Sequence, residues 1–477
     1  MILRPEPSPS RRVLMICHAF PPTGGPGVQR SLKFAKYLPE FGWRPYIWSA
    51  GPLRGLPADP TLQAEVPACA VRRTSAAWEL DRRVAATGAI GWRAQRIIRS
   101  LLDRLVPDDC LDWALRSYAP LLRWVRGERM DAIYSTYSPA SNHLLGLLLR
   151  RATGLPWVAD FRDLWTDDYA YHCARAWQHR ANVRVENRIL HDADSVVCVS
   201  DPWTDLLRRH VDTRQAGKFH TIMNAADLDD FDLGPTAPRP PRQGALGARF
   251  TLTFVGHAIR LRFPPVIREG LSRFCELAAA HGIPVCLRMV GLVSSDLHPW
   301  VESLGADVEC LGYREHGDAV AEMVRAHALL LTVTDYPQGC QARPDPSAKL
   351  FEYLAARRHD GASAGAPGWV PAKLFEYLAA QRPIFLIGPA DTVAARIVSE
   401  CRAGVCSPLD AETIARNLLV PAQEWSRGEL RAGCPPEKLA PYTREGAARQ
   451  LAALLNGLAT RSRTKAEARC ELAVPGA

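Results

Sequence analysis

An alternation of short apolar runs with amphipathic segments is the feature that most constrains the fold of this chain. The run RRVLMICHAF at residues 11–20 is followed by the glycine-rich PPTGGPG and by VQRSLKFAKYLPEFG, whose apolar residues have helical spacing. The same succession continues through WRPYIWSA, MDAIYSTYS, LPWVADF and DSVVCVS, with helical stretches between them. Strands that alternate with helices predict a parallel sheet covered by helices on both faces.

A proline-rich stretch divides this pattern into two halves. Residues 234–248, GPTAPRPPRQGALGA, contain four prolines and three glycines, which suit neither a helix nor a central strand. After this stretch, RFTLTFVG, PVCLRMVG, VECLGY, ALLLTVT and PIFLIG restart the alternation. We therefore expect an α/β protein with two Rossmann-like domains that face each other across a cleft, and ligands beyond the carboxyl ends of the strands. The predicted division is a flexible N-terminus at 1–10, an N-terminal domain at 11–233, a linker at 234–248, a C-terminal domain at 249–440, a C-terminal helix at 441–460 and a tail at 461–477.

The composition excludes several other classes of protein. Of 477 residues, 47% are hydrophobic and 23% are charged, which is typical of globular domains. No apolar run approaches the roughly 18 residues of a membrane span, and the first residues lack the apolar stretch of a secretory signal. The 13 cysteines include no CxxC pair, so we expect reduced thiols rather than disulfides or a zinc site. The net charge of +9 permits an anionic partner, but no nucleic-acid-binding pattern is present and no nucleic acid is expected.

One segment of nine residues occurs twice. The sequence AKLFEYLAA stands at Ala348–Ala356 and again at Ala372–Ala380, an offset of 24 positions. The first copy continues into RRHDGASAGAPG, which is typical of a loop, whereas the second precedes the apolar QRPIFLIG. We therefore predict that the second copy holds the structural position and that residues 348–371 are a duplicated insert in the C-terminal domain. The alternative, a core helix merely repeated, explains the apolar spacing but not the lysine in both copies.

The loop after the first strand contains Gly25 and Gly27. Glycine lets the backbone approach a ligand closely, and the N-terminus of the following helix favours phosphate. The loop is not a dinucleotide fingerprint, because Arg30 stands in place of its third glycine and the next strand ends without an acidic residue. A phosphate contact and a plain tight turn both remain open from this loop alone.

Asp160, Arg162 and Asp163 lie at the predicted end of the strand in WVADFRDLW. A carboxylate at this edge can orient a hydroxyl or accept its proton, and an adjacent arginine can hold a phosphate or fix the carboxylate. The alternative is a salt-bridged strand end. Asp167 and Asp168 follow, but neither a histidine nor a tight carboxylate cage accompanies them, so no metal site is predicted.

The second copy of the repeat carries candidate residues at the start of a helix. Pro371 is placed where a helix can begin, and Lys373 in the first turn can reach a phosphate. Glu376, one turn later, can accept hydrogen bonds from two ribose hydroxyls, and Leu374 belongs to the same predicted site.

The first strand after the linker supplies a further set of candidates. In FVGHAIRLR this strand ends at Gly256 and leaves His257, Arg260 and Arg262 in the following loop. Arginines at this position can neutralise a diphosphate leaving group, which is a main requirement of sugar transfer. For each single arginine the alternative is a solvated surface charge.

Several of these stretches together carry a family resemblance. They span about residues 11–456 and are FPPTGGPGVQRSLKFAKYL, SPASNHLLGLLLRRATGLPWVADFRDLW, SVVCVSDPW, IMNAADLDDF, VPAKLFEYLAAQRPIF and YTREGAARQLAALL. With them the chain resembles the family 4 glycosyltransferases of the GT-B fold. That resemblance implies transfer of a sugar from a nucleotide-diphosphate donor with retention at the anomeric carbon.

The resemblance also implies roles for individual residues. Gly25 and Gly27 would face the donor phosphates and the acceptor, and Arg162 and Asp163 occupy the place where many relatives carry a histidine near the reacting sugar. Glu376 matches the second glutamate of the family's paired-glutamate motif, which binds the donor ribose. The first glutamate should stand eight positions earlier, where this chain has Gly368; the corresponding position before Glu352 in the first copy is Pro344. The identity of the sugar is therefore open.

A basic amphipathic segment bears on the acceptor. In IGWRAQRIIRSLLDRLV, residues 90–106, apolar residues follow helical spacing while the arginines lie mostly elsewhere on the wheel. Such a helix can rest on an anionic membrane or pack on its own domain. We accordingly expect a cytoplasmic protein, either free or peripheral on the inner face of the cell membrane, with a carbohydrate, lipid-linked or secondary-metabolite acceptor.

The predicted function is hexosyl or N-acetylhexosaminyl transfer from a UDP- or GDP-linked sugar, in polysaccharide or cell-envelope biosynthesis. Neither a cofactor nor a metal is expected, because basic side chains and a helix terminus supply positive charge. Two alternatives remain: a catalytically inactive nucleotide-sugar-binding or scaffold protein, and a GT-B epimerase that acts on the nucleotide sugar itself.

Overall fold

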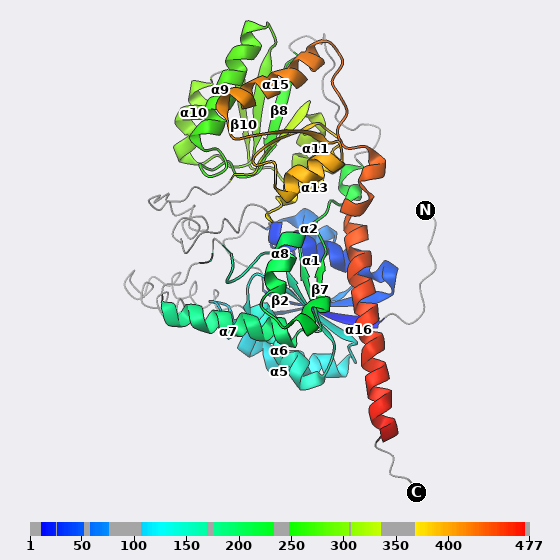
Figure 1. Cartoon of the computed structure of the whole chain (residues 1–477). Coiled ribbons are helices and arrows are strands. Elements are labelled where there is room, and N and C mark those ends of the chain that lie inside the picture. The colour runs from blue at the N-terminus through cyan, green and yellow to red at the C-terminus, as the bar shows by residue number, and fades with distance from the viewer. Residues whose placement is uncertain are drawn as a thin grey trace, which may run out of the picture. The chain divides into compact units, whose positions relative to one another are not determined.

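The computed structural model describes residues 11–24, 26–51, 58–75, 106–168, 171, 175–232, 248–304, 307–334 and 368–472. These residues form two compact units (Figure 1). The described residues within 11–223 and 444–472 make the N-terminal unit, and those within 224–334 and 368–443 make the C-terminal unit. The division thus falls after Met223, some residues before the proline-rich stretch that the sequence suggested, and the last helix belongs with the first half of the chain.

The described strands of the N-terminal unit form a parallel sheet. Their order is β3-β2-β1-β4-β5-β6-β7. Central strands are apolar and buried on both faces; four consecutive residues of β1, Val13 to Ile16, have no exposed surface. The strands are β1 (Arg11–Ile16), β2 (Trp43–Ala50), β3 (Ala70–Thr74), β4 (Ala132–Tyr137), β5 (Trp157–Phe161), β6 (Ser195–Cys198) and β7 (Phe219–Thr221).

Helices accompany this sheet, and the final helix of the chain packs against α1. The side-chain oxygen of Asn456 accepts hydrogen bonds from Arg11 Nη1 at 2.9 Å and from Trp43 Nε1 at 3.1 Å. This helix continues to Leu472, through much of the stretch expected as a tail. The helices of the unit are α1 (Pro26–Tyr37), α2 (Pro60–Ala64), α5 (Leu111–Gly127), α6 (Ser141–Thr153), α7 (Ala176–Asp192), α8 (Asp201–Arg208) and α16 (Arg444–Leu472), with short 3-10 helices η1 (Leu38–Phe41) and η2 (Thr213–Lys218).

The C-terminal unit contains a second parallel sheet. The order of its described strands is β10-β9-β8-β11-β12-β13. The strands are β8 (Phe250–Val255), β9 (Val285–Val290), β10 (Val308–Gly312), β11 (Ala328–Thr332), β12 (Ile384–Ile387) and β13 (Gly404–Ser407). The helices are α9 (Pro265–Ala280), α10 (His298–Ser303), α11 (His316–Arg325), α13 (Ala372–Ala379), α14 (Val393–Glu400) and α15 (Ala411–Ser426), with 3-10 helices η3 (Leu228–Phe231), η4 (Ser295–Leu297), η6 (Pro436–Lys438) and η7 (Ala440–Tyr442).

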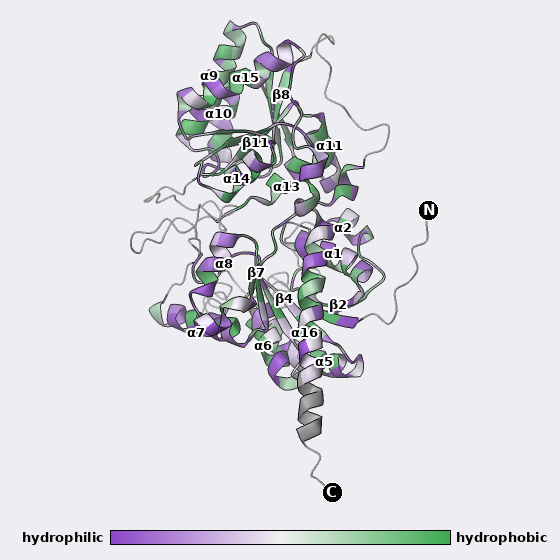
Figure 2. Cartoon of the chain, turned by 45° about the vertical axis from the view of Figure 1, so that its right-hand side comes forward, coloured by the Kyte–Doolittle hydropathy of each residue, from purple (hydrophilic) through white to green (hydrophobic). Residues whose placement is uncertain are grey.

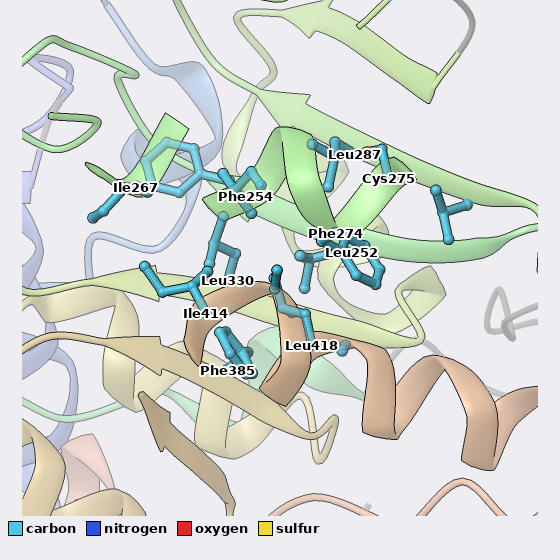
Figure 3. Packing of buried hydrophobic residues seen from close by; sticks show 14 of the residues in the cluster. Leu252, Phe254, Ile267, Phe274, Cys275, Leu287, Leu330, Phe385, Ile414 and Leu418 are labelled. Atoms are coloured by element: carbon cyan, nitrogen blue, oxygen red, sulfur yellow. The ribbon is translucent and has the colours of Figure 1, made fainter. Parts of the chain in front are cut away.

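Aromatic and branched side chains fill the space between this sheet and helices α9 and α15 (Figure 3). Phe250 and Phe254 of β8 are buried with Phe274 of α9 and Leu418 of α15. The two helices approach closely at Gly270, where an added Cβ would lie 2.8 Å from the Cβ of Ile414. In Figure 2 the strands of this sheet are mostly hydrophobic, whereas α9 and α15 carry both hydrophobic and hydrophilic residues.

Both sheets have a position where the strand order changes direction. In the N-terminal unit it lies between β1 and β4, and in the C-terminal unit between β8 and β11. Ligands of open parallel sheets bind at such a switch point, beyond the carboxyl ends of the strands. The candidate residues that directly follow these four strands are therefore the best placed to contact a ligand.

The two copies of AKLFEYLAA allow a matched test of the core. The second copy forms α13 between β11 and β12, and its Leu378 has no exposed surface; the first copy lies outside the described residues. Since only one copy can occupy this position, we expect Leu378→Ala to lower the free energy of unfolding by about 2–5 kcal/mol. The identical change in the first copy, Leu354→Ala, should lower it much less. Urea unfolding followed by circular dichroism measures both, and equal losses would contradict the assignment.

Candidate functional site

Two glycines begin the loops at the carboxyl edge of the C-terminal sheet. Gly256 follows β8 with φ +148°, and Gly291 follows β9 with φ +125°, conformations that side chains other than glycine rarely adopt. An added Cβ at Gly291 would overlap the carbonyl oxygen of Gly256. The two backbones therefore meet directly, and the segments after β8 and β9 stay in register through a 2.8 Å hydrogen bond from the Ala258 amide to the Leu292 carbonyl.

The loop after β8 carries the three basic candidates of FVGHAIRLR in different settings. Arg262 is half-buried, and its Nη1 atom lies 3.1 Å from the position that a Cβ on Gly256 would take. His257 is half-buried with Nε2 3.4 Å from the hydroxyl of Ser294, whereas Arg260 is exposed. Of the two arginines, Arg262 is the one that the fold holds against the glycine at the switch point.

Helix α13 is fixed to β8 by one buried hydrogen bond. The amide of Val255 donates to the hydroxyl of Tyr377 at 2.8 Å, and Tyr377 has no exposed surface. Burial raises the pKa of Tyr377, so the hydroxyl stays neutral. The charges of Arg262 and Glu376 both act on this phenol, which places both side chains near it.

The polar face of α13 carries the residues predicted for donor binding. Lys373 and Glu376 form an ion pair across one helical turn, and both side chains are partly exposed. Leu374, by contrast, is fully buried, and its amide donates to the carbonyl of Pro371 at 3.0 Å. Gly368 is buried in a turn before the helix. It stands where the family resemblance predicts a glutamate.

A histidine that the sequence did not single out completes this group. His316 is the first residue of α11, and its Nε2 atom lies 3.0 Å from a carboxylate oxygen of Asp230 in η3. Burial lowers the pKa of His316, but the hydrogen bond to Asp230 and the charges of Glu376 and Asp230 raise it, and the pKa lies above its ordinary value. The only signal in the sequence is that His316 follows the strand VECLGY, while Asp230 lies near the end of the family-like IMNAADLDDF.

We call Asp230, Arg262, His316, Lys373 and Glu376 the charged cluster of the C-terminal unit. It contains three basic side chains and two carboxylates, and it is placed by the loop after β8, the helices after β10 and β11, and η3. The N-terminus of α13 adds a partial positive charge. Such a group can bind an anionic ligand that also carries hydroxyls, because cations take up the negative charge and a carboxylate accepts hydrogen bonds.

The carboxyl edge of the N-terminal sheet is organised by Arg162. Its guanidinium donates from Nη1 to the carbonyl of Gly27, from Nε to the carbonyl of Tyr137 at 2.6 Å and from Nη2 to the carbonyl of Ser138 at 3.4 Å. An added Cβ on Gly27 would lie 2.5 Å from Nη1, so glycine is needed for this close approach. Arg162 thereby joins the segments after β1, β4 and β5. Gly25, the other predicted glycine, lies outside the described residues.

The two carboxylates predicted beside Arg162 have opposite environments. Asp160 is fully buried and receives two hydrogen bonds from Arg30, at 2.8 and 3.0 Å, and one from the hydroxyl of Tyr134 at 2.5 Å. Asp163 has 54% of its side chain exposed and lies 3.8 Å from Arg162 Nε. Only Asp163 is therefore presented to a ligand, and the salt-bridged strand end, the alternative reading of this motif, describes Asp160.

Arg30, the partner of Asp160, also binds the backbone at the end of the N-terminal unit. It also donates from Nη2 to the carbonyl of Ile222 at 2.9 Å and from Nη1 to that of Met223 at 3.1 Å. Met223 is the last residue before the C-terminal unit begins. The residue that excluded a dinucleotide fingerprint thus ties α1 and β5 to the segment after β7.

Two further features of the sequence concern the compartment and the membrane. Residues 90–105 of the predicted basic amphipathic segment lie outside the described residues. Among the described helices, none is both long and apolar enough to cross a membrane. The cysteines whose side chains the structure describes are free thiols.

Comparison with known proteins supports the resemblance found in the sequence. Residues 24–225 match the model of the glycosyl transferase 4-like domain. No curated protein matches the chain.

Solved structures share the architecture at low sequence identity. HepE from Anabaena, solved in complex with UDP and glucose, is 14% identical with a TM-score of 0.52, over 97% of this chain and 100% of that one. Sucrose-phosphate synthase from Thermosynechococcus elongatus gives the same identity, coverage and TM-score. The α,α-trehalose-phosphate synthase (UDP-forming) from Burkholderia vietnamiensis is 13% identical with a TM-score of 0.53, over 94% of this chain and 100% of that one. At these identities the likeness establishes the fold. The chain therefore contains a glycosyl transferase 4-like domain over residues 24–225, and its two parallel α/β sheets have the GT-B architecture of these solved structures.

Proposed function

We propose that this protein transfers a hexosyl or N-acetylhexosaminyl group from a UDP- or GDP-sugar to a hydroxyl of an acceptor, with retention at the anomeric carbon. The observation that carries the proposal is the charged cluster at the switch point of the C-terminal sheet. There Lys373 and Glu376 start α13 beside Arg262, and Tyr377 fixes them to β8. UDP in the complex of HepE, a protein of the same fold, supports the choice of ligand class.

Three members of the charged cluster, Arg262, Lys373 and Glu376, contact the donor in this proposal. Lys373, Arg262 and the amides at the start of α13 bind the diphosphate, with Arg260 and His257 at the margin of the loop. Glu376, released from Lys373 when phosphate arrives, accepts hydrogen bonds from the ribose hydroxyls. Because positive charge is already in place, the leaving diphosphate is stabilised as the glycosyl bond breaks.

The N-terminal unit supplies the acceptor side of the proposal. Asp163 is the exposed carboxylate at that sheet edge, and it orients the attacking hydroxyl, while Gly27 and Arg162 shape the segment beside it. Attack comes from the face that the diphosphate leaves, so no protein nucleophile is required. The acceptor is a saccharide, a lipid-linked sugar or a secondary metabolite, and a cytoplasmic or peripheral membrane location would suit cell-envelope polysaccharide synthesis.

A donor screen tests this function directly. Purified protein is incubated with UDP- and GDP-sugars and a panel of acceptors, and released nucleotide is measured. We expect one donor to give acceptor-dependent release, and EDTA to leave that release unchanged because side chains supply the positive charge. Conversion of the donor without any acceptor would instead indicate an epimerase.

The absence of a glutamate at position 368 favours one competing function. The glutamate that family members place eight residues before Glu376 is absent, and a non-catalytic nucleotide-sugar-binding protein needs only the ribose and diphosphate contacts. Calorimetry separates the two functions: nucleotide binding with no turnover of any donor would support a scaffold, and turnover would exclude it.

The duplicated segment provides a matched control for Glu376. A carboxylate that accepts hydrogen bonds from hydroxyls contributes about 1.5–3 kcal/mol. We therefore expect Glu376→Ala to weaken nucleotide-sugar binding roughly ten- to hundred-fold. Glu352→Ala, the same change in the same local sequence, should have little effect. Isothermal titration calorimetry gives both dissociation constants, and equal losses would show that the wrong copy has been assigned.

His316 predicts a pH dependence of donor binding. Its pKa lies above the ordinary 6.5, so its positive charge is present below that pH and is lost as the pH rises through the raised value. The phosphates of a nucleotide sugar do not titrate in this range. Binding should therefore weaken between pH 6 and pH 9, and His316→Gln should remove that slope.

Two controls accompany this prediction. His281→Gln changes an exposed histidine of the same unit and should keep the slope. Asp230→Asn removes a hydrogen bond and a charge that raise the pKa of His316, so the midpoint should move to lower pH. A slope that persists in His316→Gln would rule out this histidine as its source.

Asp163 and Asp160 should differ in what they affect. Asp163→Asn is expected to raise KM for the acceptor about ten-fold while the dissociation constant of the donor stays unchanged. Asp160→Asn leaves Arg30 without its buried partner, so it should lower the free energy of unfolding by about 3–5 kcal/mol. Kinetics with a saturating donor and urea unfolding measure the two effects. A loss of stability in Asp163→Asn, with acceptor KM unaltered, would exclude the acceptor role.

A further inference from the structure

Helix α7 presents a single stripe of basic and aromatic side chains. Apart from Ala176 at its start, its exposed residues are Trp177, Arg180, Arg184, Arg188 and His191. At 100° per residue these five positions fall within an arc of about 80°. They extend about 21 Å along the helix at 1.5 Å per residue. We call them the α7 stripe.

Buried polar contacts fix the rotation of α7 and therefore the direction of the stripe. On the opposite side, Glu186 has no exposed surface and accepts hydrogen bonds from the amide and hydroxyl of Thr166. The side-chain amide of Asn182 donates to the hydroxyl of Tyr171 at 2.7 Å. Since these groups would lose their partners if the helix turned, the stripe faces away from the unit, at whose outer edge α7 lies (Figures 1 and 2).

The charge along the stripe has one sign. Glu186 is buried, and the other carboxylate of α7, Asp192, has only 15% of its side chain exposed. Asp192 pairs with Arg188, with Arg151 of α6 and with His191, so two arginines and a histidine share one carboxylate. The side chains of Arg188 and His191 remain 57% and 63% exposed. The surface therefore carries a positive excess along its whole length.

We propose that the α7 stripe docks the protein on an anionic lipid bilayer. Arginines at a membrane surface are attracted to acidic headgroups, and Trp177, with 46% of its surface exposed, adds an indole of the kind that settles at the headgroup level. This inference does not depend on the sugar-transfer proposal, and it rests on residues other than 90–106.

Vesicle co-sedimentation of the full chain tests the proposal. We expect binding to vesicles with 30% phosphatidylglycerol, little binding to pure phosphatidylcholine vesicles, and weakening by salt. At about 1 kcal/mol per arginine, each charge removed should lower the partition coefficient roughly five-fold. The triple variant Arg180→Gln, Arg184→Gln, Arg188→Gln should therefore lose about 100-fold, and Trp177→Ala should weaken binding further.

A control variant removes two arginine charges from another surface of the protein. Arg416→Gln with Arg427→Gln takes away exposed arginines of the C-terminal unit, and this variant should bind as the unchanged protein does, apart from a small general effect of net charge. Circular dichroism melting checks that each variant is folded. The proposal is overturned if the protein ignores anionic vesicles, if the stripe variants bind undiminished, or if only a DNA oligonucleotide is bound.

Discussion

The hydrogen bond from the Val255 amide to the buried hydroxyl of Tyr377 holds the candidate donor site together. It joins the end of a central strand to a helix that begins about 120 residues later in the chain. Lys373 lies one helical turn before Tyr377 on the same side of the helix and pairs with Glu376, so this bond also holds the ion pair near the end of β8. A neutral phenol suits this position, since it accepts a backbone hydrogen bond without bringing another charge into the cluster.

The N-terminal unit contains one carboxylate that is buried in an ion pair and another, close by in the chain, that is exposed. Arg30 and Asp160 satisfy each other away from water, and Arg30 also holds the backbone at the end of the unit. Breaking such a pair leaves an unpaired buried charge, which is far more costly than losing an exposed one. Asp163, only three residues later, is exposed because the strand has ended. Neighbouring carboxylates can therefore serve different purposes.

The order of strands and helices and the two-sheet class followed from the sequence, which also supplied the candidate site residues. Apolar runs, glycine-rich turns and the repeated AKLFEYLAA are local patterns, and local patterns report secondary structure well. The second copy of the repeat was correctly placed between strands because its flanks, QRPIFLIG above all, continue the alternation. The resemblance of the sequence to family 4 glycosyltransferases agrees with the domain match over residues 24–225.

Other features needed the tertiary structure, because they depend on which distant segments meet. Sequence patterns placed Asp160 and Asp163 in one motif, but only the packing of α1 on β5 buried the first with Arg30. His316 and Asp230 are 86 positions apart, and nothing local marks either as a partner. The division of the chain after Met223 and the return of α16 to the first unit likewise arise from contacts across hundreds of residues. The sequence by itself determined the elements and the chemistry they carry, whereas the fold decided which charges are paired, which are buried and which face a ligand.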